Sequence, residues 1–366
     1  MNAKERILLV GPLPREGTPI GGTQVSFGEL VRRVQASGRL AYEVVDTSRP
    51  VIGRTGWSRA PHDVRVLAAT LRAIARVGPR CDAVLFNASS GGVMKAGPFV
   101  WAAAQAVRRP FGLRVFGGDL DLRFAREPAW RRATAERTCL SAPLVLLQTK
   151  HLCRAFERLG GAHWLPTTRD LVAPSIERTG PARRFLFLSQ LKREKGVREA
   201  LTASDALAPD STLTFHGPTI PGADLSGDHA RARFAGPVRP DELASVLARH
   251  DALVFPTWYE GEGMPGAVIE AMQAGLPVIS SRWRSLPELV EDGVNGLLVP
   301  PRDVEALGAA MRRLESDPHL FRTLARGAAE TGDRFRGGPW HAELEQRLID
   351  LCRGDCASAP FAEAVA

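Results

Sequence analysis

Short apolar runs alternate with longer amphipathic stretches along the first half of the chain. The apolar runs predict buried strands over Arg6–Val10, Tyr42–Val45, Ala83–Phe86, Gly112–Val115 and Leu144–Leu147. The amphipathic stretches between them predict helices over Thr23–Gln35, Asp63–Arg76, Phe99–Val107 and Glu127–Cys139. Such an alternation is typical of a parallel sheet with helices on both faces.

The second half repeats this rhythm. Strands are predicted over Arg184–Leu188, Thr212–Phe215, Ala252–Phe255, Pro277–Ile279 and Gly296–Val299. Helices are predicted over Gly196–Asp205, Asp241–Arg249, Gly266–Ala274, Leu286–Glu291 and Asp303–Ser316. We therefore expect an α/β protein built from two doubly wound, Rossmann-like domains.

The segment Leu165–Arg183 separates the two halves. It is rich in Pro, Thr and Arg and has no clear periodicity, which is typical of a connection. The expected parts follow in order: an N-terminal domain over 1–168, a linker over 169–183, a C-terminal domain over 184–338, a closing segment over 339–354 and a tail over 355–366. The closing segment holds a last helix, predicted over Trp340–Cys352, which we expect to pack back towards the N-terminal domain.

The composition indicates a globular protein and excludes several other classes. The chain has 366 residues, of which 44% are hydrophobic and 24% charged, so it is not a disordered chain. No apolar run approaches the roughly 18–20 residues that span a bilayer, and the N-terminus does not resemble a signal peptide. The five cysteines lack the spacing of a disulfide framework or a zinc site. We expect a cytoplasmic protein without a metal site.

The positive charge is unevenly distributed. The formal net charge is +8, yet residues 1–170 hold 26 cations and 13 anions, whereas residues 171–366 hold 22 cations and 27 anions. A basic half joined to an acidic half indicates two domains with different partners. Aromatic residues do not interleave with the arginines of the basic half, so we expect no nucleic-acid partner.

One helix of the basic half is a candidate membrane-binding element. The predicted helix over Asp63–Arg76 has an apolar face with arginines beside it: Val64, Leu67, Leu71 and Ile74, with Arg65, Arg72 and Arg76. A basic amphipathic helix can bind an anionic lipid surface. The basic half therefore predicts peripheral binding at the inner face of the membrane or a phosphate-bearing acceptor. The alternative is an ordinary helix with one core-facing side and one solvated side.

The strongest chemical signal is the stretch Glu262-Gly-Met-Pro-Gly-Ala-Val-Ile-Glu270, which follows a predicted strand. Pro265 suits the first turn of a helix, where its missing N–H costs nothing, and the N-terminus of a helix favours an anion such as phosphate. Glu270 could reach a vicinal diol such as ribose, and Glu262 could meet a second hydroxylated group. The pair therefore fits a nucleotide-sugar. The alternative is a helix-stabilising acid at 270 and a solvated one at 262.

A second signal is the basic turn Leu188-Ser-Gln-Leu-Lys-Arg-Glu-Lys-Gly196, which follows another predicted strand. Only five of the 48 cations are lysines, and two of these, Lys192 and Lys195, lie in this turn. Lysine is a compact point charge that arginine does not replace, and an ammonium group can neutralise a diphosphate leaving group. The turn therefore predicts phosphate chemistry, with a solvated basic turn as the alternative.

These motifs, together with Leu286-Pro-Glu-Leu-Val-Glu-Asp-Gly-Val-Asn-Gly-Leu-Leu-Val-Pro300, resemble the retaining glycosyltransferases of family 4. The resemblance covers about residues 184–315 and extends more weakly to the Gly21-Gly22-Thr23 loop and the closing helix. It implies the GT-B fold, in which two Rossmann-like domains face each other across a cleft. The C-terminal domain would then bind a nucleotide-sugar donor, and the N-terminal domain would bind the acceptor.

The resemblance also implies roles for single residues. Glu270 would contact ribose hydroxyls, Lys195 would bind the diphosphate, and Gly21 and Gly22 would approach the phosphates from the other domain. The transferred sugar would be held by Glu262 and the adjoining segment, which consists of Gly263, Met264, Pro265 and Gly266.

Two positions depart from the family pattern. Gln190 stands where an arginine is usual, so Lys192 becomes the candidate substitute cation at the donor site. Asp119 stands in a segment where many members carry a histidine, which makes it the candidate catalytic group on the acceptor side, beside Lys195 and Glu262. Asp119-Leu-Asp121 also matches the Asp-x-Asp signature of metal-dependent transferases, but a tripeptide is weak support and no metal is assigned.

We therefore expect a retaining, metal-independent glycosyltransferase that needs no cofactor beyond its co-substrate. It would transfer a hexose-type sugar from a nucleoside diphosphate, UDP rather than GDP, to a glycan, lipid-linked or small-molecule hydroxyl in polysaccharide or glycoconjugate synthesis. Two alternatives remain open: a nucleotide-sugar epimerase of the same fold, and a non-catalytic nucleotide-sugar-binding protein.

Overall fold

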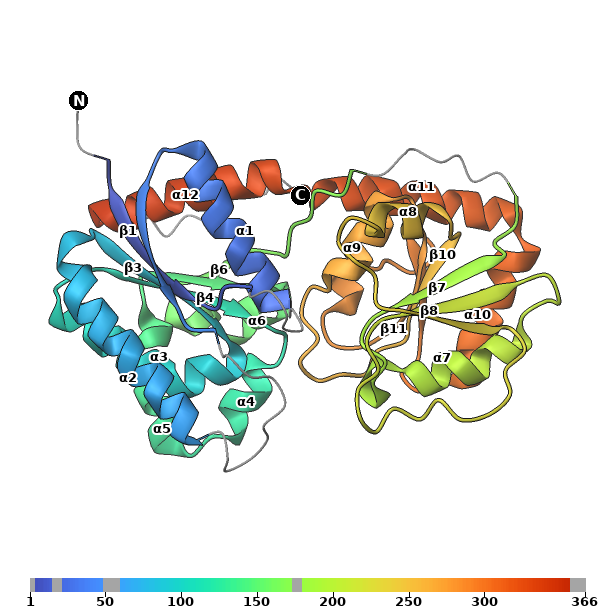
Figure 1. Ribbon diagram of the computed structural model, residues 1–366, viewed down its shortest axis with the longest axis horizontal. Helices are drawn as coiled ribbons and strands as arrows, with labels where there is room; N and C mark the ends of the chain where they lie inside the picture. The colour runs from blue at the N-terminus through green and yellow to red at the C-terminus, as the bar shows by residue number, and fades with distance from the viewer. Residues whose placement is uncertain (1–3, 15–21, 49–59, 173–179, 356–366) are drawn as a thin grey trace. The chain divides into compact units, whose positions relative to one another are not determined.

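The computed structural model describes residues 4–14, 22–48, 60–172 and 180–355. The chain divides into two compact units (Figure 1). The first unit comprises residues 1–166 and 338–366, and the second comprises residues 167–337. Among the described helices, none combines the length and the apolar composition that crossing a bilayer requires.

The first unit is built on a six-stranded parallel sheet with the order β2-β1-β3-β4-β5-β6. Its strands are β1 (Arg6–Gly11), β2 (Ala41–Asp46), β3 (Ala83–Ser89), β4 (Phe111–Phe116), β5 (Leu144–Leu147) and β6 (Ala162–Trp164). Its helices are α1 (Gly22–Ser37), α2 (Ala60–Val77), α3 (Ser90–Ala106), α4 (Leu120–Arg126), α5 (Ala129–Arg137), α6 (Lys150–Ala155) and α12 (Gly337–Arg353), whose first residue belongs to the second unit.

Helices cover both faces of this sheet (Figure 1), which is why its central strands β1, β3 and β4 are buried along almost their whole length. On one face α1 and α12 contribute a core that includes Phe27, Leu30, Trp340 and Leu348. On the other face lie α2, α3, α5 and α6, with Ile74, Val93, Val100 and Leu152 in the core. The last helix of the chain therefore packs on the first unit.

The second unit has its own six-stranded parallel sheet with the order β12-β11-β10-β7-β8-β9. Its strands are β7 (Arg184–Leu188), β8 (Thr212–His216), β9 (Ala232–Gly236), β10 (Ala252–Phe255), β11 (Val278–Ser281) and β12 (Gly296–Val299). Its helices are α7 (Val197–Ala203), α8 (Leu243–Ala248), α9 (Gly266–Gln273), α10 (Val304–Ser316) and α11 (Pro318–Arg334).

Each sheet has one position at which the chain changes direction across it. In the first unit this switch point lies between β1 and β3, because the chain moves outward to β2 and then returns past β1. In the second unit it lies between β7 and β10 for the same reason. In doubly wound sheets, ligands bind beyond the carboxyl ends of the strands at such a point.

The predicted α/β architecture of two doubly wound domains is confirmed, but several elements differ from the prediction. The helix predicted over Leu286–Glu291 is only a 3₁₀ turn over Leu286–Glu288, with a proline in its first turn. The helix predicted from Phe99 begins nine residues earlier, at Ser90, and contains Pro98. The prediction missed the elements β6, β9, α4, α6 and α11.

Local chemistry explains two of the missed elements. β9 is largely exposed at the edge of its sheet, so its sequence has no buried apolar run. α11 follows α10 after a single residue, Asp317, whose carboxylate accepts a hydrogen bond from Leu320 N at 2.9 Å and so caps the new helix. Pro318 then occupies its first turn, where a missing N–H is tolerated.

Candidate functional site

The turn after β7 approaches the loop after β10 very closely. Gly196 ends this turn in the left-handed region, with φ +76°, and a Cβ atom there would lie 2.2 Å from the carbonyl oxygen of Pro256. Only glycine fits both the backbone conformation and the available space. The Lys-Gly pair seen in the sequence is therefore what lets the basic turn contact the β10 loop at the switch point of the second unit.

Lys195 and Glu262 meet at this contact. The Lys195 ammonium group donates a hydrogen bond to Glu262 Oε2 at 2.6 Å, and Thr257 Oγ1 lies within hydrogen-bonding distance of the same oxygen at 2.9 Å. The two charged side chains are only 14% and 8% exposed. Two of the three predicted catalytic residues, from loops 67 positions apart, thus form one ion pair.

Tyr259 lies against both lysines of the basic turn. The Nζ atoms of Lys192 and Lys195 are 4.6 and 5.0 Å from the centroid of its ring, within the range of cation–π attraction. Lys192 also pairs with Glu194 at 3.4 Å. The sequence analysis did not identify Tyr259, although it is one of only two tyrosines in the chain.

Hydrogen bonds from several elements hold the β10 loop in place. Trp258 N donates to Glu194 O at 2.9 Å, and its indole N–H donates to Glu199 at 3.0 Å. Ser285 Oγ donates to Gly263 O at 2.7 Å, and the indole N–H of Trp283 donates to Tyr259 O at 3.0 Å. Supporting contacts of this kind fix the geometry of a site before a ligand arrives.

Helix α9 begins directly after this loop, at Gly266, with Pro265 as the preceding cap residue and Met264 buried beside it. Glu270 lies on this helix and accepts a hydrogen bond from Arg169 Nε at 2.8 Å. The side chain of Arg169 is 13% exposed and that of Glu270 is 20% exposed. Arg169 was missed as a site residue because it falls in the predicted linker.

The start of the predicted linker, 169–183, is not a free connection. Arg169 N donates to Phe335 O at 3.0 Å, and Gln273 Nε2 donates to Arg169 O at 2.7 Å. Leu171 N donates to Gln273 Oε1 at 3.0 Å. This stretch therefore belongs to the second unit, bound to the ends of α9 and α11, and 173–179 lies outside the described residues.

The remaining predicted site residues are more scattered. Gln190 is exposed. Gly22 is the exposed first residue of α1 in the first unit, and Gly21 lies outside the described residues. Asp119, also in the first unit, is buried and accepts a hydrogen bond from Arg123 Nε at 2.6 Å.

Asp121, the second acid of the Asp-x-Asp tripeptide, lies 2.9 Å from His151 Nε2. Within the part of the chain that the structure describes, no group of three or more acidic, histidine or cysteine side chains could hold a metal ion.

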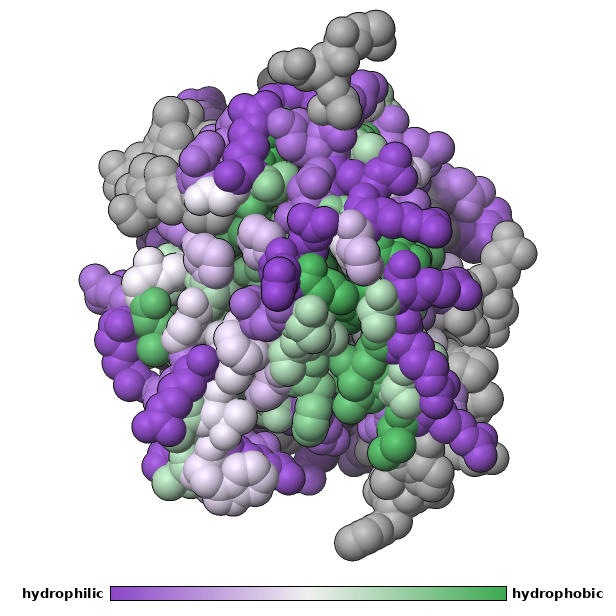
Figure 2. All heavy atoms as spheres, turned by 90° about the vertical axis from the view of Figure 1, so that its left-hand side faces the viewer, coloured by the Kyte–Doolittle hydropathy of each residue, from purple (hydrophilic) through white to green (hydrophobic). Residues whose placement is uncertain are grey.

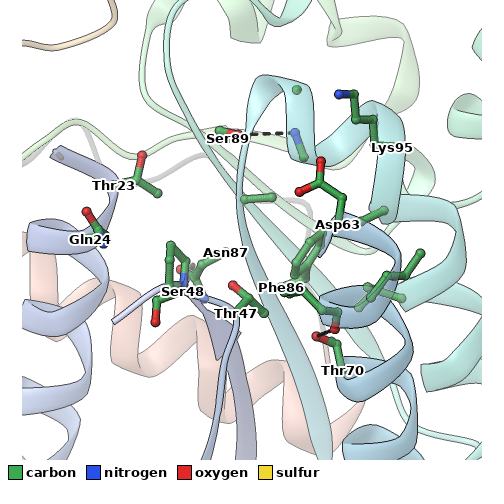
Figure 3. Close-up of a pocket in the computed structure, with 18 of the residues that line it drawn as sticks. Thr23, Gln24, Thr47, Ser48, Asp63, Thr70, Phe86, Asn87, Ser89 and Lys95 are labelled. Carbon is green, nitrogen blue, oxygen red and sulfur yellow. Dashed lines mark hydrogen bonds between the residues drawn. The ribbon is translucent and has the colours of Figure 1, made fainter. Parts of the chain in front are cut away.

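The first unit contains a pocket of about 650 Å³ at its own switch point, which the sequence analysis did not identify (Figure 3). Its polar lining comes from the ends of β2 and β3 and from α1, α2 and α3: Thr23, Gln24, Thr47, Ser48, Asp63, Thr70, Asn87, Ser89 and Lys95. Much of the remaining lining is apolar: Val64, Val66, Leu67, Phe86, Ala88, Ala96 and Val100. Such a surface suits a ligand with both apolar and hydroxylated parts.

Asn87 is the most buried polar group of this pocket. It is 1% exposed, and its Nδ2 donates to Val10 O at 3.5 Å. Its Oδ1 has no hydrogen-bond partner among the described residues. A buried carbonyl oxygen without a partner is energetically costly, so it is ready to accept a hydrogen bond from a ligand hydroxyl.

Each of the two units is doubly wound, as in the GT-B fold. The structure superposes on a sucrose-phosphate synthase from Thermosynechococcus elongatus with a TM-score of 0.74 and 20% identity, over 96% of this chain and 100% of that one. It superposes on the Anabaena protein HepE, solved in complex with UDP, with a TM-score of 0.68 and 18% identity, over 94% and 99% of the two chains. The predicted GT-B fold is thereby confirmed.

The sequence of the second unit is similar to known glycosyltransferases. Residues 182–317 match the family model described as glycosyl transferases group 1. The chain is 37% identical to glycogen synthase of Mycobacterium tuberculosis over 163 residues, which are 42% of this chain and 38% of that protein. It is 38% identical to a D-inositol 3-phosphate glycosyltransferase of Streptomyces bingchenggensis over 103 residues, 28% and 22% of the two chains. The chain thus aligns with less than half the length of these relatives.

Proposed function

We propose that the protein transfers a hexose-type sugar from a nucleoside diphosphate to an acceptor hydroxyl, with retention of anomeric configuration and without a metal ion. The observation that carries the proposal is the Lys195–Glu262 contact at 2.6 Å. It lies at the switch point of the second unit, on the loop that leads into α9. Positive charge, a carboxylate and the N-terminus of a helix together suit an anionic, hydroxylated donor.

In this proposal the ion pair is exchanged when the donor binds. The donor diphosphate becomes the partner of Lys195, and the sugar hydroxyls become hydrogen-bond donors to Glu262. Neither charge is then left buried without a partner, which would be costly. Lys195 stabilises the negative charge that develops on the leaving diphosphate, while Glu262 orients the sugar and Glu270 binds the ribose.

UDP is the proposed nucleotide. HepE was solved with UDP and with UDP-glucose, and relatives of this chain include an O-antigen chain mannosyltransferase B and an amylovoran biosynthesis glycosyltransferase. These names support a donor of the nucleotide-sugar class and a glycan or glycoconjugate product.

A panel of UDP-, GDP-, ADP- and TDP-sugars tests donor binding, because a ligand that binds the folded state raises Tm. Nucleoside diphosphate released only when an acceptor is present would support transfer, and NMR of the product would give the anomeric configuration. Product formed without an acceptor would indicate an epimerase, and donor binding without any turnover would indicate a non-catalytic binding protein.

The pocket of the first unit is the proposed acceptor site. Asn87 Oδ1 would accept a hydrogen bond from the acceptor, and the apolar lining would cover a non-sugar part. Asn87→Ala should raise the KM for the acceptor about tenfold and leave the affinity for the donor unchanged. A donor affinity that falls in parallel would contradict this assignment.

We further propose that an anionic membrane surface binds the face of the first unit formed by α2, α3 and α5. α3 contacts both α2 and α5. Each of the three helices exposes one large apolar side chain: Val64 is 65% exposed, Phe99 55% and Trp130 65%. Figure 2 shows apolar side chains gathered among hydrophilic ones on a face of this unit.

Exposed cations accompany these apolar side chains: Arg65, Arg72, Arg76, Lys95, Arg131 and Arg137. The Arg131 guanidinium lies 5.1 Å from the centroid of the Trp130 ring. Exposed apolar and basic groups on neighbouring helices match the two attractions that hold proteins at anionic lipid, which are apolar burial and charge.

Co-sedimentation with vesicles tests this surface. Binding is expected to vesicles of phosphatidylcholine with phosphatidylglycerol, to weaken with salt, and to be absent with phosphatidylcholine alone. The triple variant V64S/F99S/W130S should lose binding, whereas the control F234S, which removes an exposed aromatic residue of the second unit, should retain it. Equal binding by wild type and triple variant would contradict the proposal.

A further inference from the structure

Arg169 occupies an unusual position at the beginning of α9. A Cβ atom on Gly266 would lie 2.2 Å from Arg169 Nη2 and 2.7 Å from both Cζ and Nε. The guanidinium therefore lies directly on the Cα atom of the first residue of the helix. Glycine at 266 is what leaves room for it.

The guanidinium is held there by two hydrogen bonds. Nε donates to Glu270 Oε1 at 2.8 Å, and Nη1 donates to the carbonyl oxygen of Thr168 at 2.8 Å. The backbone that carries Arg169 is itself bound to the ends of α9 and α11. The side chain is thus fixed from both ends.

This placement runs against the electrostatics of the helix. The N-terminus of a helix carries a partial positive charge, so a cation there is unfavourable unless a negative group compensates. Glu270 supplies that compensation, since it pairs with Arg169 and lies within the first two turns of α9. Arg169 therefore does not stabilise the helix; what its position achieves is to hold the Glu270 carboxylate.

We propose that Arg169 is a positioning residue that sets the selectivity of the donor site for ribose. This inference rests on the proposed function, in which Glu270 binds the ribose hydroxyls. Arg169 holds one carboxylate oxygen of Glu270 and so fixes the plane of the carboxylate. A carboxylate has about four acceptor positions, and fixing its plane sets the directions from which a diol can donate hydrogen bonds to it.

The pairing also explains why lysine would be a poor substitute. A planar guanidinium can bind a carboxylate, rest on Gly266 and reach a carbonyl at the same time, whereas an ammonium group has no flat face. R169K should therefore keep the positive charge but only part of the selectivity for ribose. R169Q should lose both the charge and the selectivity.

The test measures the binding of UDP, GDP and ADP and of their 2′-deoxy forms to the full chain by calorimetry. Wild type should prefer the ribose form of its nucleotide by about tenfold or more, the size of one lost charged hydrogen bond. R169Q should reduce this preference to about twofold, R169K should lie between the two, and kcat should change less than the donor KM.

G266A supplies a second, independent variant. The added methyl group would displace the guanidinium from Glu270, so G266A should reduce the ribose preference as R169Q does. The double variant R169Q/G266A should show no further loss, because both changes break one contact. An additive loss in the double variant would overturn the inference.

The matched control is R184Q, which removes another arginine–carboxylate pair of the second unit, Arg184 with Asp251 at 2.7 Å. It should keep the ribose preference of wild type even if Tm falls. A preference that R169Q leaves intact, or a wild type without any preference, overturns the role of Arg169 alone. Wild type that binds no nucleoside diphosphate overturns the proposed function together with this inference.

Discussion

The two units share an architecture but differ in the chemistry at their switch points. Both place six parallel strands between helices, and both have loops converging where the strand order changes direction. In the second unit those loops bring together Lys195, Glu262 and Tyr259. In the first unit they surround a largely apolar pocket that the buried Asn87 helps to line. The fold determines where a ligand can bind, whereas the side chains on the loops determine which ligand it is.

The units also differ in which segments of the chain form them. The core of the first unit includes α12 from the far end of the chain, whereas the second unit is formed by one continuous stretch, 167–337. Trp340, on α12, is 2% exposed and packs edge-on against Trp164 with ring centroids 5.2 Å apart. The first unit therefore depends on a contact between segments that lie more than 170 residues apart in the sequence.

The largest expected effect is on that contact. Trp340→Ala should destabilise the first unit by about 3–5 kcal/mol, because it removes a buried aromatic side chain and leaves a cavity. Scanning calorimetry should show a lower transition for the first unit and an unchanged one for the second. Phe321→Ala, in the core of the second unit, should produce the reverse pattern. A single shared shift in both variants would show that the units do not unfold separately.

The next effect concerns catalysis. Lys195→Ala should lower kcat about 100–1,000-fold, the usual cost of removing one group that stabilises developing charge, and Glu262→Ala should lower it by a similar factor because the sugar loses its orientation. Because both residues act on the same donor in the same step, the double variant should be little worse than the single variants. Transfer assays with the preferred donor measure this, and turnover close to wild type in either variant would exclude that residue from the reaction.

A smaller effect on stability is expected at two glycines with positive φ, and comparing them separates the cost of backbone strain from the cost of a steric overlap. Gly160, in the first unit, has φ +73° with open space around it, whereas Gly196, in the second, has φ +76° and lies against Pro256. Gly160→Ala should cost about 1 kcal/mol for the left-handed conformation alone. Gly196→Ala should cost about 3 kcal/mol, since the added methyl group also overlaps a carbonyl oxygen. Urea denaturation measures both, and equal losses would mean that the close approach adds nothing.

The smallest effect is a loss of stability in mild acid. Burial lowers the pKa of His163 in the first unit, with Arg347 acting in the same direction and Glu343 opposing it. Burial also lowers the pKa of His250 in the second unit, against a hydrogen bond from its ring to Val246 O. Unfolded histidine has a pKa of about 6.5. The unfolded state therefore binds more protons below that pH.

The stabilising contribution of each histidine is complete above about pH 6.5 and is lost as the pH falls through its lower folded pKa. His163→Gln should flatten this dependence in the first unit alone, and His250→Gln in the second alone. Tm measured from pH 7.5 to pH 5 tests this, and profiles that keep the wild-type slope would contradict the assignment.

Much of the second unit could be read from the sequence, because its signals are local. The run over Ala252–Phe255 is a buried strand as predicted, and α9 begins at Gly266 as predicted. Glycine, proline and acidic residues at short spacing carry that information. Elements without a local signal were missed, such as the exposed edge strand β9, or misjudged, such as the 3₁₀ turn over Leu286–Glu288.

The sequence by itself determined the α/β class and the doubly wound pattern of both halves, since hydrophobic periodicity is a local property, and its short motifs predicted which residues bind a nucleotide-sugar. Only the tertiary structure decided which residues meet. It paired Lys195 with Glu262 across 67 positions and Arg169 with Glu270 across 101, and it formed the pocket of the first unit from three strand ends and three helices. Such contacts depend on strand order and loop packing, which no short stretch of sequence encodes.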